Sequence, residues 1–273
     1  MTQLPVTQLP VTQHSPTVQF ASFAYGDGVA LDDPAEAYHE ATKLYPSFAG
    51  RQVRGIALAQ EPAIAASMRR SSRRHPHRPR TVLPSAWPGP ALLDDMLAAR
   101  RSRRPSAGST LDLADLATLL SAYESGGPDA RRSIPSGGAL YPLELYVLAL
   151  HVDSLPAGVY HFDPFDRALE LLAGGEPELE GVFVDPAVPE SSAAILVVTG
   201  LFWRSRCKYG LRGYRFALLE AGHLMQTVLL LATAVGIDAL PLGGFYDAAL
   251  DCAVLADGVN ESVVYAVAAG RAP

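Results

Sequence analysis

The chain has 273 residues, of which 49% are hydrophobic and 18% are charged, and this balance suits one large globular domain with a short appendage. Two cysteines, Cys207 and Cys252, are too few for a disulfide framework or an all-cysteine zinc site. The formal charge of −6 gives no general reason to expect a nucleic-acid partner. Residues 224–240 form the longest apolar stretch, and its polar interruptions keep it short of the roughly 20 residues that a bilayer span needs. With no secretory signal recognised, we expect a cytoplasmic protein with no membrane partner.

The first part of the chain is predicted to lie outside the main domain. Residues 1–33 contain the unit Thr-Gln-Leu-Pro-Val twice, and its prolines interrupt both helices and strands. We therefore expect a flexible tail there. Residues 34–90 are expected to form an extension, which begins with a short amphipathic helix between Pro34 and Tyr45 and ends in a basic, proline-rich linker.

That linker contains a strongly basic stretch. Arg69 to Arg80 reads RRSSRRHPHRPR, with six arginines in twelve residues. The prolines favour a solvated linker, and the alternative is a site for an acidic partner, a polyphosphate or a nucleic acid. His75 and His77 would need further ligands to hold a metal, and none lies nearby in the sequence, so we expect no metal site.

Residues 91–273 are predicted to form the main domain. In chain order, helices are expected near 92–97 and 112–123, a strand at 143–152, a hairpin over 159–172, a strand at 193–199, a long helix over 212–235 and a final strand at 262–268. Strands and helices do not alternate strictly, which favours an α+β fold over a doubly wound one. The long helix is apolar nearly all round, so it is expected in a core or across a subunit interface.

Several familiar catalytic motifs are absent from the sequence. We find no dinucleotide-binding glycine motif after a strand, no phosphate-binding P-loop, no H-E-x-x-H zinc motif and no G-x-S-x-G nucleophile motif. These absences weigh against nicotinamide-Rossmann, P-loop, zinc-protease and α/β-hydrolase functions.

Two local patterns point to a bound anion. Arg100, Arg101, Ser102 and Arg104 place guanidinium groups and a hydroxyl within about one helical turn, which suits a phosphate monoester. A solvated basic helix end is the alternative. Further on, residues 135–142 read PSGGALYP, and their glycines would let backbone amides approach a ligand closely.

The order of motifs resembles the flavin nitroreductase superfamily and, within it, the SagB-type azoline dehydrogenases, which oxidise thiazoline and oxazoline rings in modified peptides. The resemblance covers roughly Tyr38 to Ala269. Its motifs are Tyr38-His-Glu-Ala-Thr-Lys43, Arg100-Arg-Ser-Arg-Arg104, PSGGALYP at 135–142, Gly158-Val-Tyr-His-Phe-Asp-Pro164, Lys208-Tyr-Gly-Leu-Arg-Gly-Tyr-Arg215, Glu220-Ala-Gly-His223 and Pro241-Leu-Gly-Gly-Phe-Tyr-Asp247.

The resemblance implies a nitroreductase-like α+β fold, an FMN cofactor and a homodimer with flavin at the subunit interface and the long helix in that interface. Residues implied to hold the phosphate and ribityl end of FMN are Arg100, Arg101, Ser102 and Arg104. Residues implied to lie along the flavin ring or to donate backbone hydrogen bonds to it are Pro135, Ser136, Gly137, Gly243 and Gly244. His223 and Gln226 are further cofactor-side candidates, and a hydrogen-bonded interface histidine is the alternative for His223.

Lys208 and Tyr209 are the expected catalytic residues, because the resemblance implicates a Lys-Tyr pair in azoline oxidation. Aromatising the ring removes a hydride from one carbon and a proton from its neighbour. Flavin can take the hydride, but the proton needs a base. Lys208 could serve as that base, with Tyr209 sharing the proton or orienting the ring.

The expected substrate is a thiazoline or oxazoline in a modified peptide or on a carrier protein, and the resemblance allows a cyclodehydratase partner. Three alternatives remain open at this point. The chain could be an NAD(P)H-dependent nitro- or quinone-reductase, a flavin-free scaffold for a heterocyclase, or a nucleic-acid binder acting through Arg69 to Arg80.

Overall fold

The computed structural model describes residues 34–44, 55–57, 61–85, 89–126 and 131–273. The predicted tail over residues 1–33 lies outside the described residues. The chain divides into two compact units, residues 1–44 and 45–273. In the first, helix α2 (Pro34–Ala41) is the predicted N-terminal helix, and the Thr42 hydroxyl donates to the Tyr38 carbonyl at 2.8 Å across its last turn.

The second unit is built on a seven-stranded sheet in the order β1-β6-β5-β4-β7-β9-β8, and every neighbouring pair is antiparallel. The strands are β1 (Arg80–Val82), β4 (Leu143–Ala149), β5 (Gly158–Asp163), β6 (Ala168–Gly174), β7 (Ala194–Gly200), β8 (Asp238–Leu242) and β9 (Ser262–Gly270). A small separate ribbon pairs β2 (Ser125–Gly126) with β3 (Arg131–Arg132). The α+β class is confirmed.

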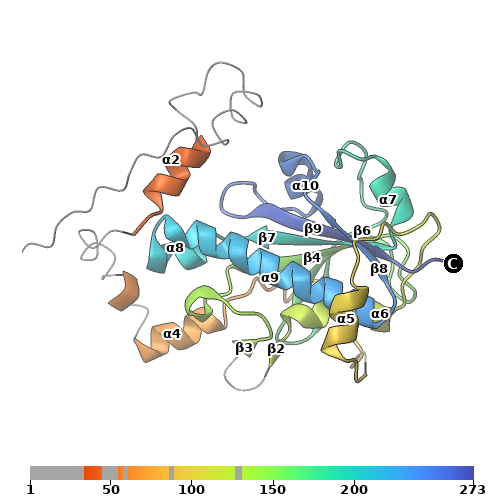
Figure 1. The fold of residues 1–273 in the computed structure, drawn as a ribbon, viewed down its shortest axis with the longest axis horizontal. Coiled ribbons are helices and arrows are strands. Elements are labelled where there is room, and N and C mark those ends of the chain that lie inside the picture. Colours follow the sequence, from red (N-terminus) through yellow and green to blue (C-terminus); the bar gives the residue numbers. More distant parts are fainter. Residues whose placement is uncertain (1–33, 45–54, 58–60, 86–88, 127–130) are drawn as a thin grey trace, which may run out of the picture. The chain divides into compact units, whose positions relative to one another are not determined.

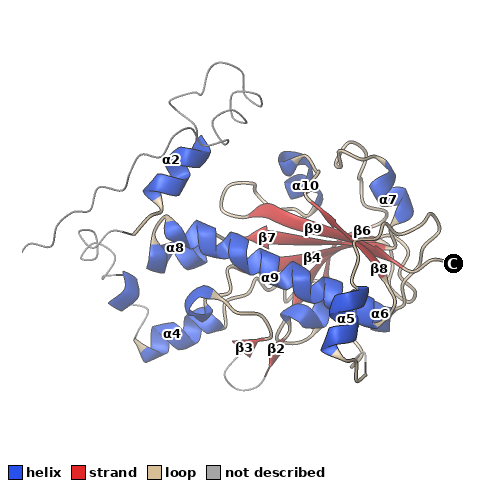
Figure 2. Cartoon of the chain, viewed as in Figure 1, coloured by secondary structure: helices blue, strands red, loops and turns tan. Residues whose placement is uncertain are grey.

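Helices cover both faces of the sheet (Figures 1 and 2). The described α-helices of this unit are α4 (Pro62–Arg69), α5 (Leu93–Ala99), α6 (Leu113–Leu120), α7 (Ala187–Ser191), α8 (Trp203–Tyr209), α9 (Arg212–Ala234) and α10 (Asp247–Ala253). Two short 3-10 helices are η2 (Ser121–Tyr123) and η3 (Gly137–Ala139).

Two apolar cores flank the central strands. Side chains alternate along a strand, so Leu145 and Val147 of β4 face the core shared with α6 and α9. Tyr146 and Leu148 face the second core, shared with α7 and α10. The continuous apolar run of β7 is fully buried, as strands covered on both faces require.

Helix α9 is buried on one side and open on the other within this chain. Ala217, Glu220, Leu224 and Val228 are among its buried residues. On the opposite side Leu219 is 54% exposed. Among the described helices, α9 alone has the length and apolar composition to cross a membrane, and 44% of its most apolar window is buried in the protein.

The basic stretch differs from the solvated linker predicted for it. Arg73 pairs with the buried Glu261 at 2.9 Å, and the His75 amide donates to buried Glu170 at 3.1 Å. Arg80 begins β1 and pairs with Asp163 at 2.9 Å. The physical reason is that carboxylates inside the sheet need donors and cations, and this stretch supplies them. The second unit therefore includes sequence well before residue 91.

Candidate functional site

A tight loop over residues 136–141, which includes η3 and leads into β4, forms the centre of the candidate site. The Tyr141 amide donates to the Ser136 hydroxyl at 2.9 Å, and the Ala139 amide donates to the Ser136 carbonyl at 3.0 Å. Gly138, Ala139 and Tyr141 all have positive φ angles, of 68°, 54° and 45°. Because left-handed backbone is unfavourable for Ala and Tyr, the surrounding contacts must hold this loop in place.

Lys208 and Tyr209, the predicted catalytic pair, lie against this loop. A Cβ added at Gly138 would collide with the Tyr209 hydroxyl and would lie 2.7 Å from the Lys208 Nζ. The Lys208 Nζ is 5.1 Å from the centre of the Tyr209 ring, so the two functional groups share one small region. Gly138 is therefore the residue whose missing side chain lets Lys208 and Tyr209 reach the loop backbone.

Phe216 of α9 packs beneath the same region. Its ring makes an edge contact with Tyr209 at 5.0 Å between centroids, and a Cβ added at Gly137 would lie 3.2 Å from it. The loop, α8 and α9 thus meet in one place. They bring together the predicted residues Ser136, Gly137, Lys208 and Tyr209. Pro135, another predicted residue, lines a cavity beside the loop, which is described below.

Arg204 fixes the orientation of α8 relative to the loop. Its guanidinium donates to buried Glu144 at 2.5 Å and to the Tyr141 carbonyl at 3.3 Å. One side chain therefore connects α8, the end of the loop and the start of β4. A charge-assisted pair of this kind is among the stronger polar contacts in a protein.

A buried carboxyl, that of Glu220, lies under the loop. Burial raises the pKa of Glu220 to about 7, while a hydrogen bond from Ser136, the positive charge of Arg132 and a hydrogen bond from Tyr123 act in the opposite direction. The Arg132 guanidinium lies 3.9 Å from the centre of the Tyr123 ring and 4.6 Å from that of Tyr141. Glu220 stood in the sequence only as the first residue of the Glu220-Ala-Gly-His223 motif, and nothing in that motif connected it with the loop or with Arg132.

A cavity of about 530 Å³ opens beside the loop. Its lining includes Arg69, Arg131, Arg132, Ser136 and Gly138. The cavity therefore lies between a wall rich in arginine and the loop against which the predicted catalytic pair of α8 packs. Such a wall favours an anionic or strongly polar ligand group.

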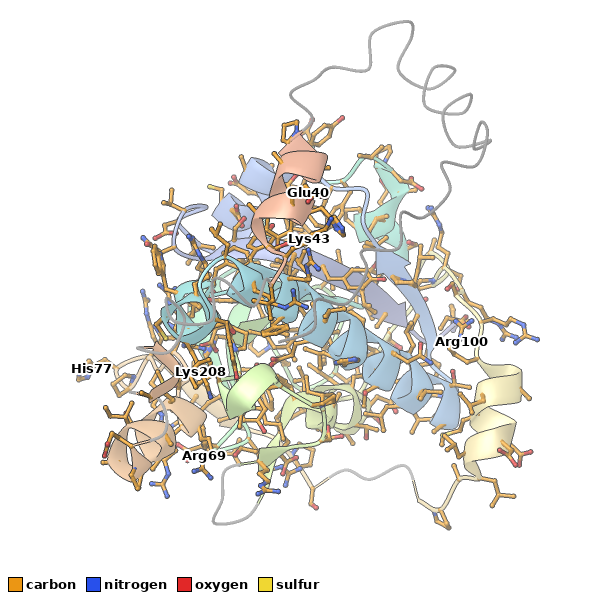
Figure 3. The ribbon with its side chains drawn as sticks, turned by 60° about the vertical axis from the view of Figure 1, so that its left-hand side comes forward. Glu40, Lys43, Arg69, His77, Arg100 and Lys208 are labelled. Atoms are coloured by element: carbon orange, nitrogen blue, oxygen red, sulfur yellow. The ribbon has the colours of Figure 1, made fainter. Side chains whose placement is uncertain are left out.

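The predicted phosphate-binding residues form a second group, away from the loop. Arg100 caps α5, and the following chain runs beside β8, where the Arg103 amide donates to the Ala239 carbonyl at 3.0 Å. Arg104 is hydrogen-bonded to Asp185. Figure 3 shows Arg100 and Lys208 on well-separated parts of the chain.

The remaining predicted residues are exposed. Gly244 accepts a hydrogen bond from the Val184 amide at 3.0 Å, next to the partner of Arg104, and Gly243 has no atom within 4 Å of where its Cβ would be. Arg101 and Ser102 are exposed beyond α5, and His223 and Gln226 lie on the open side of α9. Within one chain the arginines and Gly244 form one group. Loop 136–141 with Lys208 of α8, here called the Lys208 loop, forms a second group that lies apart from the first.

Comparisons with known proteins agree with the geometry. Residues 97–271 match the family model described as "Nitroreductase family". The chain is 33% identical over 158 residues to "Putative nitroreductase MJ1384" of Methanocaldococcus jannaschii, covering 57% of this chain and 80% of that protein. It is 34% identical over 146 residues to the microcin B17-processing protein McbC of Escherichia coli, covering 47% of this chain and 50% of McbC. The chain thus aligns with about half the length of McbC.

A solved structure also shares the fold. A chain of the E. coli microcin synthetase McbBCD complex, with truncated pro-MccB17 bound, matches with a TM-score of 0.57 at 23% identity. The match covers 89% of this chain and 95% of that chain. The nitroreductase-like fold predicted from the sequence is confirmed.

Replacing Gly138 with alanine tests the close approach of Lys208 and Tyr209. Gly181→Ala is the matched control, because Gly181 has the same φ of +68° but no atom within 4 Å of the added Cβ. We expect Gly181→Ala to cost about 1 kcal/mol of unfolding free energy from backbone strain alone. Gly138→Ala should cost at least about 1 kcal/mol more, because the new methyl group displaces two side chains. Urea unfolding measures both, and equal losses would contradict the placement.

Replacing Glu220 with glutamine tests its buried carboxyl. The folded-state pKa of Glu220, about 7, is above the ordinary 4.5, so the native protein holds the proton more tightly and loses stability as pH rises from about 4.5 through 7. Glu220→Gln cannot ionise. Its unfolding free energy relative to the parent should therefore improve by about 2 kcal/mol between pH 5 and pH 8. The exposed Glu178→Gln is the control, and a difference for Glu220→Gln that is independent of pH would refute the prediction.

Proposed function

Because the chain belongs to the nitroreductase family, we propose that it is of the SagB type, an FMN-dependent dehydrogenase that oxidises thiazoline or oxazoline rings to thiazole or oxazole. Membership of the family indicates an oxidoreductase, and the family generally binds flavin. The observation that carries the finer proposal is the position of Lys208 Nζ and Tyr209 Oη against Gly138.

The donor set fits a flavin mononucleotide. The exposed residues Arg100, Arg101 and Ser102 offer guanidinium forks and a hydroxyl, which match a phosphate monoester. Arg104 would join them in holding the phosphate and ribityl end. Gly243 leaves open space where a side chain would stand, so its backbone is free to meet a flat ring.

A second copy of the chain would complete the site. The arginine group and the Lys208 loop lie at separate places along α9, whose 23 residues span about 34 Å. Two chains related by a two-fold axis would bring the arginine group of one copy toward the loop of the other. Pro135, Ser136 and Gly137 would then lie along the ring, and the exposed His223 and Gln226 would face the cofactor or the partner helix.

The protein's own residues would supply the proton chemistry. When bound, FMN supplies the acceptor for the hydride. Lys208 would take the proton from the neighbouring ring carbon, and Tyr209 would orient the heterocycle or share that proton. Phe216 would support Tyr209 from below, since their rings are in edge contact. The arginine-lined cavity beside Gly138 would receive the rest of the substrate.

The substrate would be a peptide or carrier-bound heterocycle made by a cyclodehydratase. The relative McbC processes microcin B17, and the structural match comes from a complex that holds a truncated pro-peptide. A partner that forms the azoline and delivers it to this chain fits those relatives. An NAD(P)H-driven nitro- or quinone-reductase is the second candidate, favoured by the family match itself.

An absorption spectrum of the purified protein tests the cofactor. We expect flavin bands near about 370 and 450 nm, with mass spectrometry of the released chromophore identifying FMN. The bands should be weaker by at least half in an Arg100→Ala/Arg104→Ala variant purified in parallel, because phosphate contacts are lost. A colourless protein that takes up no added FMN would instead support a flavin-free scaffold.

Lys208→Ala tests the proposed base. On a synthetic thiazoline peptide, we expect kcat to fall by at least about 100-fold with flavin content unchanged. Nitrofurazone reduction by NADPH, which needs no such base, should change less than about twofold. Arg206→Ala is the control, since Arg206 lies on the same helix but contacts Trp203 at 4.4 Å. Equal loss of both activities in Lys208→Ala, or no loss of azoline oxidation, would count against the dehydrogenase.

A further inference from the structure

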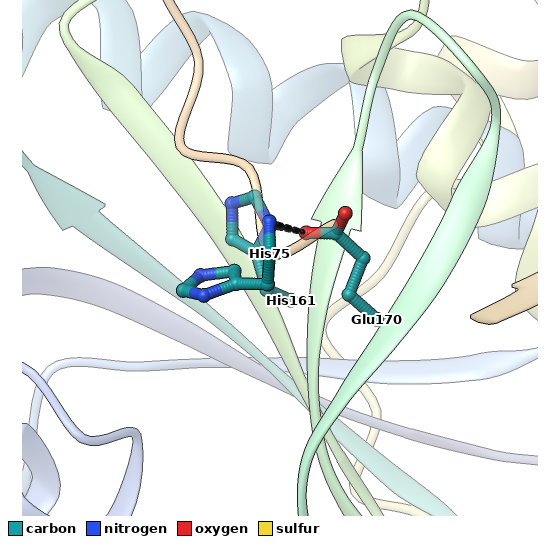
Figure 4. A group of neighbouring side chains, drawn as sticks. All are labelled: His75, His161 and Glu170. Atoms are coloured by element: carbon teal, nitrogen blue, oxygen red, sulfur yellow. Dashed lines mark hydrogen bonds and ion pairs between the residues drawn. The ribbon is translucent and has the colours of Figure 1, made fainter. Parts of the chain in front are cut away.

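A second cluster of functional side chains lies away from the candidate flavin site. His75 comes from the basic stretch, His161 from β5 and Glu170 from β6 (Figure 4). One potential ligand atom from each residue lies within 4.8 Å of the others. His161 and Glu170 are fully buried, and His75 is partly buried.

Two polar atoms in this cluster have no hydrogen-bond partner. They are His75 Nε2 and Glu170 Oε1, both inaccessible to solvent. Arg80 Nε lies 3.7 Å from Glu170 Oε1, which is too long for a hydrogen bond. Leaving buried polar atoms unpaired costs free energy, so each of these two atoms calls for a partner that the described residues do not supply.

The His161 ring is already oriented by carboxylates. Its Nδ1 lies 3.1 Å from Glu170 Oε2, and its Nε2 lies 2.9 Å from Glu144 Oε2. A metal-ligating histidine commonly donates its other ring N–H to a carboxylate, which fixes the ring and the tautomer. Glu144 occupies that position for His161.

We propose that His75, His161 and Glu170 form a binding site for a divalent transition-metal ion, with Zn²⁺ the ion that suits them best. Two imidazole nitrogens and one carboxylate are a ligand set that zinc accepts, with a fourth position left for water. His75 Nε2 and Glu170 Oε1 gain a partner on binding. The proton that His161 Nδ1 shares with Glu170 leaves to solvent, while Nε2 keeps its hydrogen bond to Glu144.

Such an ion would tie the basic stretch to the sheet. Ser71, four residues before His75, accepts a hydrogen bond from Arg132 at 3.3 Å, and Arg69 lines the cavity beside Gly138. A metal at His75 would therefore stiffen one wall of that cavity. The site is structural in this role, since His161 faces the core shared with α7 and α10 rather than the Lys208 loop.

The test is zinc binding by the full chain without a histidine tag, after removal of metal with a chelator. Calorimetric titration with ZnCl₂ should show one equivalent bound to the parent and to His77→Ala. His77 is the matched control, because it is an exposed histidine two residues from His75 and outside the cluster. His75→Ala should weaken binding at least about tenfold, and zinc should raise the Tm of the parent but not of this variant.

His75→Gln guards against a folding defect, because it keeps a polar side chain of similar length. Circular dichroism and urea unfolding without zinc should match the parent for His75→Gln, which should still lose zinc. The proposal is overturned if the parent binds no zinc. It is equally overturned if His75 variants bind as tightly as the parent, which would assign the ion to another site such as the exposed Cys207 or Cys252.

Discussion

The placement of the candidate site depends on one buried carboxylate, Glu144. It is 1% exposed, and it accepts hydrogen bonds from Arg204 of α8, from His161 of β5 and from the backbone amide of Arg73. Burial alone would raise the pKa of Glu144, but the hydrogen bond from His161 and the charge of Arg204 lower it to about 2. A carboxylate buried in this way is tolerable because its partners are complete, and removal of any partner would leave it uncompensated. The strand, the helix and the basic stretch are therefore held in one arrangement.

The Arg204–Glu144 pair also sets the position of the proposed catalytic residue Lys208, because both Arg204 and Lys208 belong to α8. Arg204 holds Glu144 with one nitrogen and the Tyr141 carbonyl with another, so the helix is fixed to the end of the glycine loop. Lys208 lies one helical turn further on and meets Gly138 as a result. Catalytic groups must be held close to their working geometry by supporting contacts. Here a buried ion pair, rather than a flexible surface turn, gives that support.

Sequence patterns predicted the elements that depend on local periodicity. The long helix expected over 212–235 is α9, and the apolar run expected as a central strand is β7. The contacts of the basic stretch with buried carboxylates were not predicted, because partners such as Glu261 are distant in sequence. The same limit hid the approach of His75 to His161 and Glu170. Hydrophobic periodicity carries no information about which distant carboxylate a given cation will meet.

The loop itself shows why the candidate site could be recognised but not built from sequence. The PSGGALYP motif indicated a backbone close to a ligand, and positive φ at a glycine was foreseeable. Positive φ at Ala139 and Tyr141 was not, because such strain persists only where tertiary contacts impose it. Those contacts are Arg132 against the Tyr141 ring and the Ser136 hydroxyl on the Tyr141 amide. A strained loop held from several sides is already close to its working shape, which suits the proposed reaction, whose main requirement is that ring, acceptor and base be aligned.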